Sequence, residues 1–488
     1  MRFLISELAT QLRGRVIGGV DSEIAAATQA NESAELAADG LAIDTRLVIP
    51  KQLFAAMRAE RDGHDYLDAA FTAGAAAVLI DNEASYEALL AAQSGPAEHG
   101  GLGPGILVAD VSAALMEIAK IARRRIPDRV VGVTGSVGKT TTKDLLAVVL
   151  AQKFVTVASE KSFNNELGVP LTLANAAVAT EAAVVEMGAR GAGHIALLCE
   201  LARPTVGIVT TVERVHTQVM GSIEQIAQAK GELISALPAT GLAVLNADVA
   251  LVAGMAQRTD ARVLCFGQGG DVQAIDVQID DELRPRFVLV SPWGQVELRL
   301  AIRGAHNVSN ALAAAAAALG LGLSLEQVAA GLELASSSPW RMDLQPMANG
   351  ALLLNDSYNA GPASMAAALQ ALVSLPDVSP DRGSLADQMS SGAALPFEAH
   401  RGRRIAVLGF MAELGDTATQ EHQAVAELAE QLQIQIIAVG TDLYGVPGLE
   451  GIGEALRALE SLSLTEGDAV LIKASRVVGL ERLAQSLL

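Results

Sequence analysis

The sequence predicts an α/β fold that is divided into three domains. Its 488 residues exceed what one hydrophobic core supports, since a domain typically holds about 100 to 200 residues. Short apolar segments alternate with helical stretches in two separate parts of the chain, which is typical of parallel sheets covered by helices. The buried-type segment 130–133 runs into a glycine-containing loop and then into a helix. We therefore expect two α/β domains after a smaller N-terminal one.

The composition, with 51% hydrophobic, 18% charged and 3% aromatic residues, is that of a globular protein. A net charge of -20 argues against a nucleic-acid partner, because phosphate backbones are bound by clustered Lys and Arg. No apolar stretch approaches the ~20 residues of a membrane span, and the N-terminus lacks the apolar core of a signal peptide. The two cysteines, Cys199 and Cys265, provide no disulfide framework. We expect a cytoplasmic protein without membrane insertion.

The N-terminal domain is expected over residues 1–110. Alternating segments at 41–47 and 76–80 predict strands, and polar helical stretches separate them. The Gly/Pro-rich stretch 94–105 predicts a loop near the end of the domain. This pattern indicates a small α/β domain.

The central domain is expected over 111–338 and the C-terminal domain over 339–488. The central one begins with a helix near Ser112 and includes an alanine-rich helix at 310–319; its strands are predicted at 129–133, 183–185, 206–210 and 243–245. The C-terminal strands are predicted at 352–354, 404–408, 434–439 and 469–472. The stretch 377–400 is rich in Ser, Pro, Gly and Asp and predicts a mobile insertion.

A candidate phosphate-binding loop consists of Thr134, Gly135, Ser136, Val137, Gly138, Lys139, Thr140 and Thr141. A strand, a glycine loop and a helix in this order bring backbone N–H groups together around a phosphate. Lys139 would reach the β- and γ-phosphates, and Thr140 would bind Mg²⁺. The strict pattern has glycine where this chain has Val133. The alternative is a glycine turn that only caps a helix.

Glu186 and His216 each follow a predicted strand. Parallel α/β sheets bind ligands at the carboxyl ends of their strands, so both side chains could face the nucleotide. An acidic residue at a strand end is about as often a surface cap as a metal ligand, and a lone histidine is more often structural. Their position after a phosphate loop favours the functional interpretation.

At this point the motifs resemble the Mur ligases. The resemblance extends from the Asp44 region to Glu481, and it rests on six segments: 162–170 (SFNNELGVP), 186–188 (EMG), 229–232 (AKGE), 304–307 (GAHN), 356–360 (DSYNA) and 471–476 (LIKASR). The family's fold implies a central P-loop ATPase-like parallel sheet with helices on both faces, and a C-terminal Rossmann-like domain. The segments 164–170 and 356–360 favour the branch of the family that adds a D-alanyl dipeptide.

The resemblance implies an ADP-forming carboxylate–amine ligase of peptidoglycan precursor synthesis. Its substrates would be UDP-N-acetylmuramoyl-tripeptide, D-alanyl-D-alanine and ATP. ATP would phosphorylate the terminal carboxylate of the tripeptide, because oxide is a very poor leaving group, and the dipeptide amine would attack the acyl phosphate. Since both partners are anionic, cations must neutralise charge in the site.

The resemblance also assigns residues to this chemistry. The catalytic set would be Lys139, Glu186, His216 and Lys230, and Mg²⁺ would be held by Thr140, Glu186, His216 and Lys230. Lys230 matches a family lysine that is carbamylated; without the resemblance it would be read as a solvated helix lysine. The nucleotide site would include Asn246, His306, Asn307, Asn310, Arg341 and Asp356.

Substrate contacts are assigned to both ends of the chain. In the N-terminal and central parts the resemblance points to Asp44, Thr45, Arg46, Asn164 and Asn165, and in the C-terminal part to Tyr358, Asn359, Lys473, Ser475 and Arg476. For Asp44, Thr45 and Arg46 a simple turn between strands is an equal alternative, and Arg341 could be a surface ion-pair partner. The enzyme is expected to be a monomer whose C-terminal domain closes over ATP.

Four positions depart from the family pattern. Thr211 and Ser162 stand where Asn is usual, Lys51 replaces Gly and Phe410 replaces Asp. Three alternatives stay open: another Mur-type or folylpolyglutamate-type ligase, a catalytically weakened nucleotide-binding relative, and, least favoured, a mechanical or nucleic-acid P-loop ATPase. Retention of Lys139, Glu186 and Lys230 argues against the weakened relative.

Overall fold

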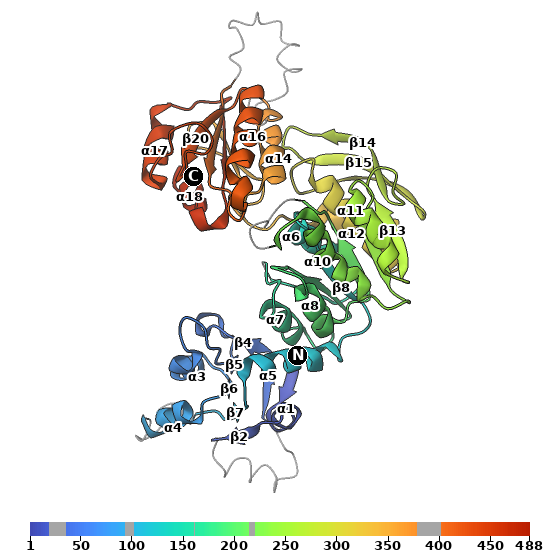
Figure 1. Cartoon of the computed structure of the whole chain (residues 1–488), viewed down its shortest axis with the longest axis vertical. Coiled ribbons are helices and arrows are strands. Elements are labelled where there is room, and N and C mark those ends of the chain that lie inside the picture. The colour runs from blue at the N-terminus through green and yellow to red at the C-terminus, as the bar shows by residue number, and fades with distance from the viewer. Residues whose placement is uncertain (19–35, 93–101, 161, 214–219, 378–401) are drawn as a thin grey trace, which may run out of the picture. The chain divides into compact units, whose positions relative to one another are not determined.

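A computed structural model describes residues 1–18, 36–92, 102–160, 162–213, 220–377 and 402–488 (Figure 1). The chain forms two compact units. One consists of Met1–Gly132, Phe154–Gly188 and Ala196–Thr205, and the other of Val133–Lys153, Ala189–Ile195 and Val206–Leu488. Both mix helices with strands, as the sequence predicts. Among the described residues no helix is long and apolar enough to cross a membrane.

The first unit contains a five-stranded sheet in the order β2-β7-β6-β5-β4. Its strands are β2 (Arg15–Ile17), β4 (Leu41–Ala42), β5 (Leu53–Ala55), β6 (Ala77–Ile80) and β7 (Gly105–Leu107), and β1 (Arg2–Leu4) pairs separately with β3 (Ala37–Asp39). Neighbours from β4 to β7 run parallel, whereas β2 is antiparallel to β7. The accompanying helices are α1 (Ile5–Gln11), α3 (Leu67–Thr72), α4 (Glu83–Ala92), α5 (Val111–Arg123) and α7 (Gly168–Ala174).

Two expectations for this region need correction. The strand predicted over 41–47 ends at Ala42, because the Asp44 side chain accepts the Arg46 N–H at 3.0 Å and starts a 3-10 turn, η1 (Thr45–Leu47). The predicted loop 94–105 ends earlier, since Gly105 already begins β7; most of that stretch lies outside the described residues. The strand predicted at 76–80 is confirmed as β6, and Asn175, after α7, holds β4 by bonds to both backbone groups of Leu41.

A six-stranded sheet has the order β13-β12-β11-β8-β10-β9. Its strands are β8 (Val130–Thr134), β9 (Thr156–Ala158), β10 (Ala182–Glu186), β11 (Val206–Val209), β12 (Leu242–Asn246) and β13 (Arg262–Phe266). The pairs β9–β10, β11–β12 and β12–β13 are parallel. All four predicted central strands are confirmed, and β9 and β13 were missed at the two edges.

Helix α12 (Asn307–Gly320) packs on α6 (Lys139–Leu150) and on strands β12 and β13. Its run Ala313–Ala318 is fully buried, and such small side chains let the helix approach its neighbours closely. Other helices of the central part are α8 (His194–Ala202), α10 (Ile223–Ser235), α11 (Ala250–Ala253) and α13 (Leu325–Leu334). The predicted alanine-rich helix is thus confirmed, three residues longer at its start.

A small antiparallel sheet follows, which the sequence reading missed. Its strands are β14 (Gln273–Ile279), β15 (Pro285–Ser291) and β16 (Gly294–Arg299), joined in that order (Figure 1). The register shifts between Ile275 and Gln278, where Asp276 has a φ of 55°. A bulge of this kind breaks the two-residue period by which a strand is recognised.

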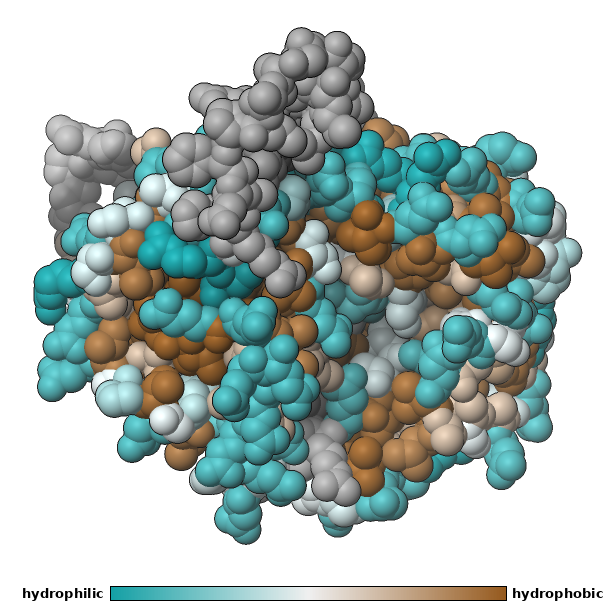
Figure 2. All heavy atoms as spheres, turned by 90° about the horizontal axis from the view of Figure 1, so that it is seen from above, coloured by the Kyte–Doolittle hydropathy of each residue, from teal (hydrophilic) through white to brown (hydrophobic). Residues whose placement is uncertain are grey.

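The C-terminal sheet has the order β17-β18-β21-β19-β20. Its strands are β17 (Asp343–Pro346), β18 (Leu352–Asn355), β19 (Arg404–Gly409), β20 (Gln435–Val439) and β21 (Ala469–Lys473). Helices α14 (Pro362–Val373) and α16 (Ala418–Gln431) cover one face, and α17 (Ile452–Ser461) and α18 (Glu481–Leu487) cover the other (Figure 1). The four predicted strands are confirmed, while the predicted insertion lies almost wholly outside the described residues. On the face shown in Figure 2, hydrophilic side chains are interspersed with hydrophobic ones.

Candidate active site

The phosphate loop requires glycine at two positions. Gly135 has a φ of 151°, and a Cβ there would lie 1.9 Å from Oγ1 of Thr210. Gly138 has a φ of 86°, and its Cβ would lie 2.3 Å from Oδ1 of Asn310. Larger residues rarely adopt such φ values and would collide with these neighbours. The loop conformation is therefore built into the sequence.

Residues that follow β11 hold the loop in place. The Thr211 carbonyl accepts the Ser136 N–H at 2.8 Å, and the Thr210 hydroxyl donates to the Val137 carbonyl at 2.6 Å. The Lys139 ammonium donates to the carbonyls of Gly135 at 2.8 Å and Ser136 at 3.1 Å, so it lies across its own loop. These bonds fix residues 135–137 of the loop. Thr211 holds the loop through its backbone carbonyl. This contact therefore does not require the asparagine side chain that is usual at this position in the family.

Helix α6 begins at the end of this loop with a left-handed Gly138 before it. Among the described residues no side chain caps this helix end, and Thr140, 6% exposed, lies in its first turn. The first N–H groups of a helix carry partial positive charge and bind anions well. The geometry thus provides what a phosphate needs.

Three asparagines of the predicted nucleotide site brace this region. Asn310 accepts a hydrogen bond from the Thr142 hydroxyl at 3.3 Å and donates to Asn307 at 2.8 Å. Asn246 donates to the Thr210 carbonyl at 2.8 Å. Their side chains therefore help to position α6 and the residues that hold the loop. Direct contact of these asparagines with a nucleotide stays a prediction.

Lys230 lies on α10 and is 3% exposed. Burial, with a smaller contribution from the charge of Lys139, lowers the pKa of Lys230 to about 7. An amine with such a pKa is largely neutral at slightly alkaline pH, and a neutral amine is the form that reacts as a nucleophile. The solvated-lysine alternative is therefore wrong.

Glu186, in the first unit, is a buried carboxylate, and only one of its two oxygens accepts a hydrogen bond from the described residues. Its Oε1 accepts a hydrogen bond from Asn164 at 2.9 Å, and its backbone N–H donates to Ser159 at 3.1 Å. Among the described residues no hydrogen-bond partner reaches its Oε2, although that atom is buried. A buried carboxylate oxygen without a donor is costly unless a cation binds it, so this position fits Mg²⁺.

In the C-terminal part, Asp356 joins the ends of two strands. Its Oδ2 forms an ion pair with Lys473, and its Oδ1 accepts the Met342 N–H at 3.1 Å. Lys473 is 2% exposed and also donates to the Asn359 carbonyl at 3.0 Å. Ser475 accepts the Ala412 N–H at 2.9 Å. These residues therefore gather at the carboxyl ends of β18, β19 and β21, where α/β sheets bind ligands.

Two arginines lie over aromatic rings at the same sheet edge. The Arg341 guanidinium carbon is 4.1 Å from the Tyr358 ring centre, and that of Arg476 is 4.4 Å from the Trp340 ring centre. Arg476 also pairs with Glu481 at 3.0 Å. Both contacts are cation–π interactions, which fix the plane of the guanidinium. The surface ion-pair alternative for Arg341 finds no support among the described ion pairs.

His306 precedes α12 and has exposed surface, yet protein atoms crowd around its ring. This loss of bulk solvent lowers the pKa of His306; the charge of Asp356 opposes the shift, and those of Lys473 and Arg341 add to it. The lowered pKa favours the neutral imidazole. Charges from the C-terminal part thus act on the predicted nucleotide site.

The N-terminal candidates form a tight turn. Asp44 accepts bonds from the Arg46 guanidinium at 2.9 and 2.6 Å, which lowers the pKa of the Asp44 carboxyl. Thr45 lies in the turn between them, and the Arg46 side chain is 85% exposed. Asn165 accepts the N–H groups of Leu167 and Gly168, at the beginning of α7. Substrate contact by these residues stays a prediction.

His216 lies outside the described residues. Two departures from the family pattern have structural explanations. Lys51 has a φ of 76°, a conformation that favours the usual glycine. Phe410 stacks on the buried His422, with ring centres 5.2 Å apart, where a carboxylate would be expected to raise the histidine pKa.

Some residues of this site carry weak sequence signals. The roles of four residues depend on neighbours that are distant in the chain: Ser159, Asn164, Thr210 and Trp340. Only the Ser/Thr residues near strand ends could have been suspected as loop-binding hydroxyls. Aromatic residues are rare here, with two tryptophans in the chain, and this rarity could have singled out Trp340 beside Arg341.

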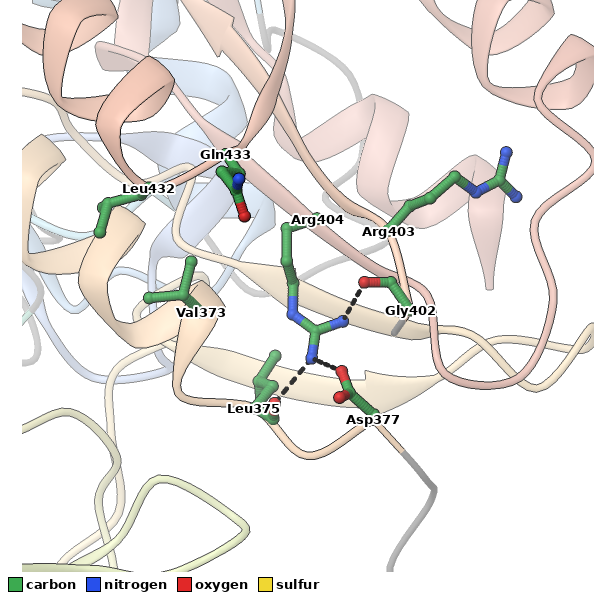
Figure 3. Close-up of a pocket in the computed structure, with 8 residues that line it drawn as sticks. All are labelled: Val373, Leu375, Asp377, Gly402, Arg403, Arg404, Leu432 and Gln433. Carbon is green, nitrogen blue, oxygen red and sulfur yellow. Dashed lines mark hydrogen bonds and ion pairs between the residues drawn. The ribbon is translucent and has the colours of Figure 1, made fainter. Parts of the chain in front are cut away.

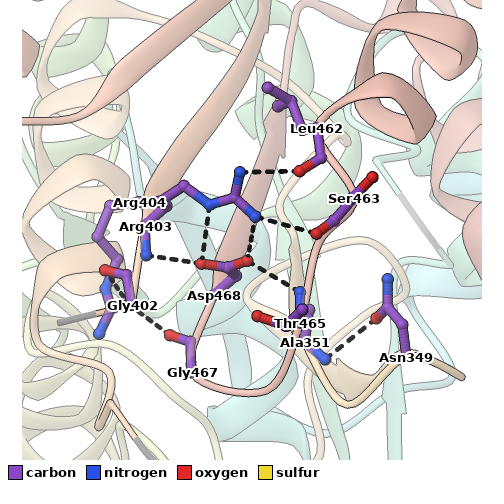
Figure 4. A network of polar contacts seen from close by, with 10 residues as sticks. All are labelled: Asn349, Ala351, Gly402, Arg403, Arg404, Leu462, Ser463, Thr465, Gly467 and Asp468. Atoms are coloured by element: carbon purple, nitrogen blue, oxygen red, sulfur yellow. Dashed lines mark hydrogen bonds and ion pairs between the residues drawn. The ribbon is translucent and has the colours of Figure 1, made fainter. Parts of the chain in front are cut away.

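A cavity of about 280 Å³ lies at the opposite end of the C-terminal sheet (Figure 3). Arg404 lines it and donates to Leu375 and Gly402 carbonyls and to Asp377. Beside it, Arg403 donates three hydrogen bonds to the buried Asp468, two from its guanidinium and one from its backbone N–H (Figure 4). Both arginines are already hydrogen-bonded to protein groups at the amino ends of strands, so we interpret this region as structural.

Comparisons with known proteins agree with this geometry. Residues 133–318 match the Mur ligase middle domain. The chain is 38% identical over 522 residues to the UDP-N-acetylmuramoyl-tripeptide–D-alanyl-D-alanine ligase of Mycobacterium tuberculosis, covering 99% of this chain and 98% of that protein. The Escherichia coli enzyme of the same name is 32% identical, covering 93% and 95%.

The fold has a counterpart among solved structures. A crystal structure of MurF from Acinetobacter baumannii superposes with a TM-score of 0.80 at 26% identity, covering 100% of this chain and 99% of that one. This likeness confirms the predicted three-domain α/β fold class. The chain therefore belongs to the Mur ligase family, in the branch of the UDP-N-acetylmuramoyl-tripeptide–D-alanyl-D-alanine ligases.

Proposed function

We propose that this protein joins D-alanyl-D-alanine to UDP-N-acetylmuramoyl-tripeptide at the expense of ATP, in peptidoglycan precursor synthesis. The observation that carries the proposal is the phosphate loop, in which Gly135 and Gly138 fit only as glycines and Lys139 lies across the loop. The full-length similarity to ligases of that name supports the choice of substrates. The protein would act in the cytoplasm as a monomer, without nucleic-acid or membrane partners.

The reaction requires activation of a carboxylate. An oxygen of the tripeptide carboxylate takes the γ-phosphoryl group of ATP, which releases ADP and forms an acyl phosphate. The amine of D-alanyl-D-alanine then attacks the carbonyl carbon; the C–N bond forms, the C–O bond to phosphate breaks, and the amine loses a proton. The N–H groups at the start of α6 and the Lys139 ammonium would hold the phosphates in line for the first step.

We assign Mg²⁺ binding to Thr140, Glu186, His216 and Lys230. The buried, unpartnered Oε2 of Glu186 supports this assignment from the structure. Bound Mg²⁺ would offset the negative charge of the phosphates and the carboxylate. Asn164 would keep Glu186 oriented by its hydrogen bond, as partners behind metal ligands commonly do.

For Lys230 we propose carbamylation. The neutral amine would attack CO₂, form an N–C bond and lose a proton, which converts a buried cation into an anion. The burial of Lys230 and its pKa of about 7 support this, because the ordinary ammonium form could not react. A carbamate is also the form that could bind a metal ion.

The remaining assignments belong to the same proposal. Domain boundaries are placed after residues 110 and 338. ATP would contact Asn246, His306, Asn307, Asn310, Arg341 and Asp356, and the peptide substrates would contact Asp44, Thr45, Arg46, Asn164, Asn165, Tyr358, Asn359, Lys473, Ser475 and Arg476. The clustering of Asp356, Lys473 and Ser475 at one sheet edge supports the C-terminal part.

The decisive assay measures phosphate release from ATP with UDP-N-acetylmuramoyl-tripeptide, with and without D-alanyl-D-alanine. We expect turnover to require the dipeptide and to yield the pentapeptide by mass spectrometry. Tripeptides ending in lysine and in diaminopimelate should be compared. Lys139→Ala should abolish turnover, whereas Lys120→Ala, a change at a partly exposed lysine paired with Glu117, should not. Turnover that ignored the dipeptide would refute the proposed substrate.

A further inference from the structure

The backbone around Arg341 is strained on both sides. Trp340 has a φ of 62° and Met342 a φ of 50°, values that are unusual for residues with large side chains. Such conformations cost energy and persist only where the surroundings impose them, and they are frequent at functional sites. The chain thus holds one particular orientation of the residue between them.

Contacts within the C-terminal part impose this conformation. The Trp340 carbonyl accepts the Tyr358 N–H at 3.2 Å, and the Met342 N–H donates to Asp356 at 3.1 Å. Met342 itself is 3% exposed and packs in the core formed with α14 and α16. The peptide units on both sides of Arg341 are therefore tied to the segment 356–358.

The side chains continue the arrangement. Arg341 lies over Tyr358 and Arg476 lies over Trp340, so two arginine–aromatic pairs are joined by the 340–341 peptide and the bond to Tyr358. Among the described residues the buried Nε of Arg341 has no hydrogen-bond partner. A guanidinium held by its flat face keeps the N–H groups at its edge for a planar anion.

We propose that Trp340 is a positioning residue of the ligase site: its ring orients Arg476 and its strained backbone orients Arg341 toward an anionic substrate group. This rests on the proposed substrate roles of the two arginines. A carboxylate or a phosphate would be bound through the edges of the guanidinium groups. Trp340 acts through these arginines and need not touch a substrate itself.

Aromatic character is the property to test. Trp340→Leu keeps a large apolar side chain but removes the ring face, and we expect kcat/KM to fall about three- to tenfold, in line with one partly exposed cation–π contact. Trp340→Phe should stay within about twofold of the parent. Thermal midpoints of the two variants should agree. The KM is measured separately for ATP, the tripeptide and the dipeptide. We expect kcat/KM to fall only for the substrate that the arginines bind.

The chain offers a matched control. Trp293, the other tryptophan, also lies under an arginine, with Arg262 at 5.5 Å, but far along the chain at the β15–β16 turn. Trp293→Leu should leave kcat/KM unchanged. In an Arg476→Met background, Trp340→Leu should lower kcat/KM clearly less than in the parent, because its partner is already gone.

The outcomes separate the two proposals. If the parent and Trp293→Leu ligate the dipeptide but Trp340→Leu and Trp340→Phe are equally active or equally impaired, only the positioning role is wrong. If the parent does not ligate, the proposed function is wrong, and the contact is tested by NMR of arginine-labelled protein. A ring-current shift of Arg476 that is lost in Trp340→Leu supports positioning, and its absence in the parent refutes it. If Trp340→Leu does not fold, Trp340→Met replaces it.

Discussion

Gly138 and Asn310 stand so close that any Cβ at position 138 would lie 2.3 Å from the asparagine Oδ1. Asn310 comes from the first turns of α12, and Gly138 precedes α6, so the contact links the phosphate loop to a helix far along the chain. This relationship makes the shape of the loop sensitive to a single carbon atom.

Gly138→Ala should therefore lower kcat/KM by about 10²-fold, the usual cost of displacing a catalytic group by about 1 Å. Combining it with Asn310→Ala removes the collision but not the strain at a φ of 86°, so only part of the activity should return. Gly254→Ala is the control, because a Cβ there meets no atom within 4 Å. Full activity in Gly138→Ala would show that the loop is not held as described.

Glu186→Gln keeps the size of the side chain but removes its charge. We expect activity to fall by about 10²-fold or more, since the gain from a metal bound to a carboxylate is lost. Asn164→Ala should raise the Mg²⁺ concentration needed for half-maximal activity by about tenfold. Mg²⁺ titrations of the phosphate-release assay measure both. Glu181→Gln, at the exposed position just before the same strand, should behave like the parent. An Mg²⁺ dependence unchanged in Glu186→Gln would contradict the assignment.

Lys230→Ala should be inactive, and short carboxylic acids such as acetate should restore part of the activity by replacing the carbamate. The parent should lose activity when CO₂ and bicarbonate are removed and regain it when they return. Lys153→Ala, which alters a lysine bound to the Gly322 carbonyl, should need no additive. A fully active Lys230→Ala without any acid would rule out the carbamate.

Asp468→Asn should destabilise the C-terminal part by about 2 kcal/mol, because the buried carboxylate binds Arg403 and the Thr465 N–H. Burial opposes ionisation of Asp468, but these hydrogen bonds and the Arg403 charge together lower its pKa below 3.8. The contribution is thus present above pH 3.8 and disappears as pH falls through the lowered pKa.

Urea unfolding at several pH values measures this effect. The difference between parent and Asp468→Asn should be constant from pH 6 to 8 and shrink below about pH 4. Asp416→Asn, at an exposed position of the same part of the chain, should not alter stability. A difference that persisted unchanged at low pH would mean that Asp468 stabilises through packing.

Local sequence patterns predict most of the fold. Strands β8, β10, β11 and β12 are short buried runs between helices, so their sequences alone predict them. The sheet β14–β16 escaped prediction because its exposed strand β14 carries apolar residues on its outer face and a bulge at Asp276. The strand, loop and helix around Lys139 were likewise predictable, because one short segment of sequence forms them.

Relationships between distant segments were not. The sequence near Trp340 does not predict its contact with Arg476, and the sequence near Glu186 does not predict its contact with Asn164. These pairs meet only in the folded chain. The burial of Lys230 was equally hidden: a lysine on a helix reads as solvated until the packing around it is known. The resemblance to Mur ligases supplied that role, and the structure adds a physical reason for it.

The alanine run of α12 has a consequence for how this protein can vary. Alanine has no side-chain torsion, so six buried alanines in succession leave the helix no rotamers with which to absorb a neighbour's change in volume. Asn307 and Asn310 are carried on that same helix, and any shift would move both together. Because these two asparagines are proposed to contact ATP, substitutions that enlarge residues beneath α12 are expected to lower the affinity for nucleotide before they lower the stability of the protein.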